Sequence, residues 1–194
     1  MRGQLLRLVQ RRLQHFYALE GVPDVLDFVR EVDDAARETL LVRESEDGIE
    51  LALLLPKRLL EPGAPQGDAD GLLQAFEGVS HFVYLAERVR TGLPTTRLEL
   101  ELQAEVDKFV LLAVEGEGLP ASARGALCQR LFEHVRFLHD AASEDGQRYR
   151  LANALAARYV RRLDPHGEPA ALRRQLGCFY RAGQTDKIRM ARAA

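Results

Sequence analysis

The 194 residues carry 27 lysines and arginines against 29 aspartates and glutamates, which gives a formal net charge of −2. With 46% hydrophobic and 29% charged residues, the composition is that of an ordinary globular protein and excludes a disordered or collagen-like chain. We expect one domain over residues 1–194. No apolar run approaches the roughly 20 residues of a membrane helix, so we expect a cytoplasmic protein without membrane contact.

The small net charge hides an uneven distribution along the chain. Residues 1–43 carry no net charge, residues 44–144 carry −9, and residues 145–194 carry +7. An acidic middle and a basic end are compatible with internal complementarity, with head-to-tail association or with an anionic partner. The sequence leaves these three alternatives open.

The first 37 residues are predicted to form two helices. Residues 4–19 place apolar side chains at three- and four-residue spacing, and this spacing is typical of a helix with one buried face: Leu5, Leu6, Val9, Leu13 and Phe16. Gly21 ends this helix. Pro23 or Asp24 then opens a shorter helix, whose apolar residues are Val25, Phe28, Val29 and Val32.

The period then changes from helix to strand. Residues 38–44 and 49–55 flank the dipeptide Asp47-Gly48, a strong signal for the tight turn of a β-hairpin, so we predict a hairpin over residues 38–56. One strand face would carry Ile49, Leu51, Leu53 and Leu55. An isolated hairpin is marginal in water, so it must rest on helices or pair with more strand. Its free edge is the favoured site for self-association.

Residues 61–71 are predicted to be a loop, and residues 70–194 a helical core. Two long helices meet at a short link: Gly92 suits the left-handed position after the first, and Thr96 with Glu99 forms a capping box for the second. We expect these two helices to be antiparallel neighbours. Further helices are predicted from about residue 120 to 142, from 148 to 163, from 169 to about 183, and around Ile188. The apolar stripe of the helix predicted from about residue 120 to 142 is Leu127, Leu131, Val135 and Leu138. The predicted fold is therefore mainly α (α+β).

A metal or acid–base site is one candidate on the two long helices. Glu77 and His81 are four residues apart, a spacing that lets a carboxylate and an imidazole reach one ion. Glu101 and Glu105 share a face of the next helix. The alternative is that Glu77 and His81 form a surface pair and that Glu105 pairs with Lys108. The Glu-x-x-His pattern of di-metal bundles is absent, so ordinary helix pairing is favoured and no cofactor is expected.

A basic ridge is the second candidate. Arg150, Arg158 and Arg161 recur at helical spacing, Arg162 adjoins them, and Arg192 is among the cations that follow. Such a ridge could bind phosphates. The alternative is a solvated helix face, or a face that docks against the acidic middle of the same chain. No nucleic-acid-binding motif accompanies it, and the isoelectric point near 6.2 does not favour nucleic acid.

Nucleophilic catalysis is not indicated. Ser80 adjoins His81 but lacks the Gly-x-Ser-x-Gly turn of a hydrolase. Cys128 and Cys178 lie far apart on predicted helices without an activating motif, and we expect buried thiols in a reducing compartment. The chain is therefore more simply interpreted as a protein that is not an enzyme.

Three segments, EGVSHFVYLAERV, LELELQAEVDKF and RYRLANALAARYVRRL, resemble a bacterial family of uncharacterised, mainly helical proteins. The resemblance implies a helical fold and no activity or site. The function that we expect is that of a cytoplasmic adaptor or regulator, which acts through a protein–protein interface as a homodimer. Metal binding through Glu77, His81, Glu101 and Glu105, and anion or nucleic-acid binding through the basic ridge, are the alternatives.

Overall fold

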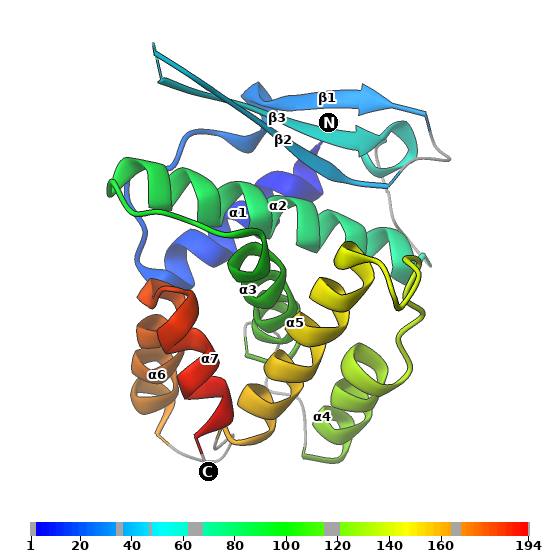
Figure 1. The fold of residues 1–194 in the computed structure, drawn as a ribbon, viewed down its shortest axis with the longest axis vertical. Helices are drawn as coiled ribbons and strands as arrows, with labels where there is room; N and C mark the ends of the chain where they lie inside the picture. Colours follow the sequence, from blue (N-terminus) through cyan, green and yellow to red (C-terminus); the bar gives the residue numbers. More distant parts are fainter. Residues whose placement is uncertain are drawn as a thin grey trace. The chain divides into compact units, whose positions relative to one another are not determined.

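A computed structural model describes residues 3–33, 37–46, 48–61, 68–114, 121–163 and 168–193. The chain forms two compact units, Met1–Leu93 and Pro94–Ala194. Within the described residues there are seven α-helices and one three-stranded sheet, so the mainly α (α+β) prediction is confirmed (Figure 1).

The first unit begins with helix α1, Gln4–Tyr17. Leu6, Val9, Leu13 and Phe16 are buried as their spacing predicts. The helix ends earlier than predicted, because Ala18 takes the left-handed conformation (φ 52°) before Gly21 is reached. The 3-10 turn η1, Val25–Asp27, follows, and the Asp24 side chain accepts a hydrogen bond from the backbone N–H of Leu26 at 3.0 Å.

The sheet contains β1, Val29–Val32, β2, Thr39–Ser45, and β3, Gly48–Pro56. Its strand order is β1-β3-β2, and β2 pairs antiparallel with β3. The predicted hairpin is therefore confirmed, although Asp47 of the predicted turn lies outside the described residues. A second 3-10 turn, η2, Lys57–Leu59, follows β3.

Strand β1 corrects the prediction of a second N-terminal helix. Its residues pair in parallel with β3, from Val29 opposite Leu53 to Val32 opposite Pro56. Phe28, Val29 and Val32 have a spacing that fits a helix, but the backbone donors and acceptors of this segment are satisfied by the central strand instead. This pairing supplies the additional strand that an isolated hairpin would need.

Helix α2, Ala69–Arg90, starts at an N-cap Asp68 whose side chain accepts from the backbone N–H of Gly71. It crosses one face of the sheet, on the side where α1 also lies (Figure 1). A Cβ atom on Gly78 would lie only 3.2 Å from Leu53, so the absence of a side chain there lets helix and strand approach closely. Leu53 and Leu55, both 0% exposed, form the centre of this contact. Of the predicted loop 61–71, residues 62–67 lie outside the described residues.

The second unit contains α3, Arg97–Phe109, with the predicted capping box between Thr96 and Glu99. A π-helical turn, η3, Val110–Val114, continues it. The remaining helices are α4, Ala121–Cys128, its π-helical extension η4, Gln129–Glu133, and then α5, Glu144–Arg161, α6, Pro169–Arg181, and α7, Gln184–Arg192. Helix α3 packs on α5, which packs on α7.

The helix predicted to reach residue 142 ends at Glu133, and residues 134–142 are not helical. Leu131 is buried, whereas Leu138 is 61% exposed. The segment turns to meet the start of α5: His139 stacks on Tyr149, with ring centroids 5.1 Å apart. A Cβ on Gly146 would lie 1.8 Å from the Asp140 carbonyl oxygen, so the backbones meet at a glycine. These contacts with α5 prevail over the helical spacing of the apolar residues.

The boundary between the units follows Leu93, in the turn between α2 and α3. Gly92 in that turn has the predicted positive φ, 65°. The antiparallel pairing of α2 with α3 and a single domain over residues 1–194 stay predictions. None of the helices in the described part of the chain is long and apolar enough to cross a bilayer.

Candidate functional site

A cleft in the second unit has the clearest chemical character. Its volume is about 430 Å³, and η4, α5 and the end of α7 contribute its walls. Three arginines and one carboxylate line it together with apolar side chains. The lining includes Phe132, Glu133, Leu151, Arg158, Arg161 and Arg192. We call this group of residues the arginine cleft.

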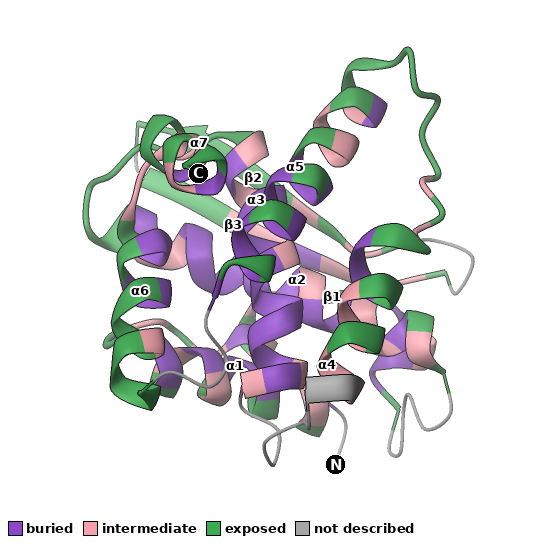
Figure 2. Cartoon of the chain, turned by 90° about the horizontal axis from the view of Figure 1, so that it is seen from below, coloured by how far each residue is buried: buried purple, intermediate pink, exposed green. Residues whose placement is uncertain are grey.

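The geometry of α5 explains how these side chains reach one surface. Ser143 caps the helix by accepting from the backbone N–H of Gly146 at 3.0 Å. Leu151, Arg158 and Arg161 then follow one exposed face, while Leu155 and Tyr159 lie among the buried residues of the helix. Figure 2 shows this division as exposed and buried stretches along α5. The spacing predicted from the sequence is thus the spacing that builds the cleft.

The charges of the arginine cleft are only partly neutralised. Arg161 donates to the Glu133 carboxylate at 2.6 Å, and both side chains are about half exposed. Within the described residues, Arg158 and Arg192 have no ion-pair partner. The cleft therefore presents two guanidinium groups that are available to a ligand and a third that is shared with Glu133.

The other two arginines of the predicted ridge lie outside the cleft lining. Arg150 donates to the backbone carbonyl oxygens of His139 at 3.2 Å and Gly146 at 3.0 Å. Arg162 donates to the carbonyl oxygen of Ala191 at 3.0 Å. Because their donors are used on the protein's own backbone, these two residues hold α5 to its neighbours.

The metal candidates Glu77 and His81 lie on α2 in the first unit. A carboxylate oxygen of Glu77 and a ring nitrogen of His81 lie within 4.8 Å of each other. His81 is buried, so the alternative of an exposed surface pair is wrong for this residue. A third group, Glu38, precedes β2 and was not indicated by the sequence.

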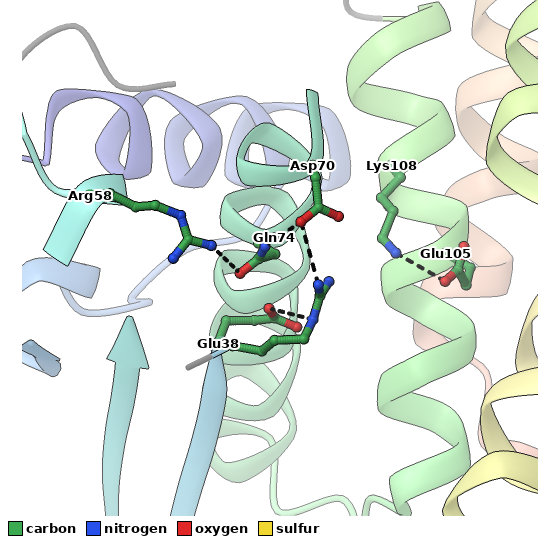
Figure 3. Close-up of polar contacts among 7 residues, drawn as sticks. Glu38, Arg58, Asp70, Gln74, Glu105 and Lys108 are labelled. Carbon is green, nitrogen blue, oxygen red and sulfur yellow. Dashed lines mark hydrogen bonds and ion pairs between the residues drawn. The ribbon is translucent and has the colours of Figure 1, made fainter. Parts of the chain in front are cut away.

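Glu38 carries a large electrostatic perturbation in the first unit. Its side chain is 8% exposed, and the Arg37 guanidinium lies 3.9 Å away. Burial, followed by repulsion from Glu77, raises the pKa of this carboxyl to about 8, against the weaker opposing effects of Arg37 and His81. Figure 3 shows Glu38 beside α2, close to Asp70 and Gln74. At neutral pH this carboxyl therefore holds a proton.

The other two metal candidates, Glu101 and Glu105, lie on α3 in the second unit. Glu105 accepts from Lys108 at 2.9 Å, which is the helix pair that the sequence suggested (Figure 3). Glu101 is buried. The set of four is divided between two units, so a shared metal site stays a prediction, and elemental analysis of the purified protein tests it.

The second unit also buries a complete lysine side chain. Lys187 on α7 is 0% exposed; its ammonium group donates to the side-chain oxygen of Gln103 and lies 4.4 Å from the centre of the Phe179 ring. Gln103 in turn donates to Asp107 at 2.8 Å. This network joins α3, α6 and α7. It has a structural role, because a buried charge is tolerated only with such partners.

The thiols and the serine lack the environment of a nucleophile. Burial raises the pKa of Cys128, which disfavours the reactive thiolate. Cys178 is exposed, and Cys128 is half-buried, so the prediction of two buried thiols is wrong: α6 buries Leu176 and Phe179 on its opposite face. Ser80 is buried.

Sequence reasoning missed the part that Arg192 and Glu38 play. Arg192 lines the cleft only because α7 packs against α5, and no local pattern in the sequence predicts that contact.

Comparison with known proteins adds nothing to these assignments: no protein-family model matches the chain, nor does any curated protein or solved structure.

Proposed function

We propose that this protein is a non-enzymatic adaptor of the bacterial cytoplasm that acts through protein–protein interfaces and associates with a second copy of itself through strand β2. The observation that supports this proposal most strongly is the apolar surface of the β2–β3 hairpin. Leu41 is 50%, Val42 46% and Ile49 42% exposed. Exposed apolar groups next to an open strand edge are typical of an interaction surface.

The hairpin continues the core face of the sheet beyond the helix that covers it. Leu40 lies opposite Leu53, Val42 opposite Leu51, and Glu44 opposite Ile49, so these side chains share one face. That face is buried at Leu53 and exposed at Val42 and Ile49. In Figure 1 the free end of the hairpin rises away from α2. Apolar side chains therefore continue along this face of the sheet beyond the part that α2 covers.

Strand β2 supplies the backbone groups for pairing. Within the described residues it pairs only with β3, so its other edge is open. A second copy can add its own β2 antiparallel to this edge about a two-fold axis perpendicular to the sheet. Such an axis keeps each face of the sheet on the same side in both copies. Residues directly opposite each other share a face, so one residue of β2 must lie opposite the same residue of the second copy.

This symmetry restricts the register. A centre at Arg43 or Glu44 would place like charges opposite each other, which is unfavourable. A centre at Leu41 or Val42 places apolar side chains together. Arg43 also forms an ion pair with Glu50 of its own chain, which leaves its charge compensated within each copy. The dimer that we propose is thus centred on Leu41 or Val42.

The cytoplasmic part of the proposal is supported by the cysteines. Cys128 and Cys178 are free, and Cys178 is exposed. Exposed free thiols persist in a reducing compartment, whereas secreted proteins usually pair their cysteines.

Sedimentation velocity tests the proposed self-association. We expect a dimer at micromolar concentration, because an edge pairing with apolar contacts adds a strand to both sheets. The variant Val42→Lys should sediment as a monomer, since it places one charge of each copy at the proposed axis or one residue from it, within the apolar contact. Leu8→Lys is the matched control, since Leu8 has a similar exposure, 41%, and lies on α1 of the same unit. A wild-type monomer, or a dimer that survives Val42→Lys, would contradict the proposal.

A further inference from the structure

We infer that the arginine cleft binds an acidic segment of a partner protein, with carboxylates on Arg158 and Arg192 and one apolar side chain against Leu151. This inference rests on the proposed function in one respect, that the ligand is a protein. It names the chemistry of the partner and uses residues that are far in sequence from β2.

The charge of the cleft points to an anion. Arg158 and Arg192 have no ion-pair partner within the described residues, although they line the same cleft as Arg161. Neighbouring guanidinium groups repel each other unless an anion lies between them. The planar, forked donors of arginine match a carboxylate in two parallel hydrogen bonds. The cleft can therefore accept two carboxylates, or one carboxylate that both arginines share.

The apolar part of the lining points to a ligand that is more than an ion. Leu151, 39% exposed, and the exposed Ala154 supply the apolar surface of the lining, whereas Leu155 and Phe132 are buried. The cleft has a volume of about 430 Å³ and is widely open to solvent, which suits one side chain of a longer segment rather than an enclosed small molecule. A free phosphate would leave this apolar surface in contact with water. A peptide with a leucine or a similar residue among its carboxylates would cover it.

Nucleic acid fits the same surface less well. A strand of phosphates requires a continuous basic track, but Arg150 and Arg162 use their donors on the protein's backbone carbonyls. Glu133 also lines the cleft, and a phosphate backbone has no N–H group to donate to it. The same carboxylate can accept from the backbone N–H of a peptide. Phe132 is buried, so it offers no exposed ring on which a base could stack.

Fluorescence anisotropy of the full-length protein tests the inference. The probe is a short fluorescein-labelled peptide in which glutamates flank a single leucine. We expect saturable binding that weakens with salt, and about tenfold or greater loss of affinity in Arg158→Ala/Arg192→Ala, because both carboxylate contacts are removed. Both arginines are exposed and alanine favours a helix, so this variant should fold, and its circular dichroism confirms that.

The matched control is Arg189→Ala, on the same helix as Arg192. Arg189 pairs with Asp186 at 2.8 Å and is absent from the cleft lining, so its removal should change affinity by less than about twofold. A peptide with serine in place of the leucine should bind more weakly. Unchanged affinity of the double variant, or tighter binding of a short oligothymidylate than of the peptide, would overturn the inference.

The same titration separates this inference from the proposed dimer. Val42→Lys should bind the peptide as the wild type does, whether or not the wild type is dimeric, because β2 contributes nothing to the cleft lining. A monomeric wild type that binds the peptide would refute the dimer and leave the cleft intact. A dimer that binds no peptide would refute the cleft and leave the dimer intact.

Discussion

The two units expose opposite kinds of chemistry. The first leaves apolar side chains uncovered on the β2–β3 hairpin, whereas the second has two arginines in the arginine cleft that form no ion pair with any described residue. Each exposed set of side chains can be compared with a buried side chain on the same sheet or helix. Leu53 shares a sheet face with Val42, and Lys187 shares helix α7 with Arg192. Within each pair, the buried member holds the fold together, and the exposed member is available to a partner.

The comparison on α7 predicts the largest effect. Lys187→Ala should lower the free energy of unfolding by about 3–5 kcal/mol, because it removes one member of a buried charged network and leaves the side-chain oxygen of Gln103 without its donor. Arg192→Ala should change it by less than about 0.5 kcal/mol. Urea unfolding followed by circular dichroism measures both. Equal losses of unfolding free energy for the two substitutions would contradict the distinction between a buried structural lysine and an exposed arginine that is available to a ligand.

The comparison on the sheet predicts the next largest effect. Leu53→Ala should cost about 2–4 kcal/mol of unfolding free energy, since Leu53 is 0% exposed and packs against α2 at Gly78. Val42→Ala on the same face should cost less than about 1 kcal/mol when measured at a concentration where the protein is monomeric. The same urea experiment decides between these values. A large loss for Val42→Ala would mean that the free end of the hairpin belongs to the core.

The Glu38 side chain is buried next to the start of β2, and its protonation makes the stability of the protein depend on pH. Its pKa is raised to about 8 in the folded protein by burial and by Glu77, whereas the pKa of an unfolded glutamate carboxyl is about 4.5. The folded state therefore holds a proton that the unfolded state releases. Stability should fall by about 1.4 kcal/mol per pH unit from roughly pH 5 to pH 8 through this group.

Glu38→Gln isolates this contribution, since the amide mimics the protonated carboxyl and does not titrate. Urea unfolding at a series of pH values should give a flatter profile for the variant than for the wild type. Parallel profiles would show that Glu38 is ionised in the folded protein.

Salt provides the smallest and most selective comparison. Between about 0.05 and 0.5 M NaCl, the dimer that we propose should change its dissociation constant by less than about threefold, because its contacts are apolar and backbone contacts. Binding of the acidic peptide to the arginine cleft should weaken several-fold more over the same range. Sedimentation and anisotropy measure the two. If both respond alike, the two surfaces do not differ in the chemistry assigned to them.

Local patterns in the sequence predicted the elements whose contacts are local. The alternation in residues 38–55, the capping box at Thr96 and Glu99, and the proline that starts α6 each act within a few residues. Strand β1 was missed because its partner, β3, lies more than twenty residues away and the spacing of Phe28, Val29 and Val32 also fits a helix. The end of the helix at Glu133 was missed for the same reason, since Gly146 and Tyr149 set it from a distance.

The candidate site shows the same limit. Helical spacing placed Arg158 and Arg161 correctly on one exposed face of α5. It could not tell that Arg150 and Arg162 would bind backbone carbonyls, because those acceptors come from other segments. Arg192 enters the cleft through the packing of α7, and Glu38 is buried through the packing of the sheet on α2. Helical spacing predicts which side chains share a face, but it does not predict which other segments pack against that face.

Amide hydrogen exchange of the whole chain tests most directly whether the two surfaces are separate. Exchange is measured by mass spectrometry at low and high protein concentration, with and without the acidic peptide. We expect higher concentration to slow exchange in residues 39–45 only, and the peptide to slow exchange only in residues 129–133, in residues 151–161 and at the end of α7 around Arg192. Exchange in residues 39–45 that ignores concentration, or peptide protection that falls on the hairpin, would contradict it.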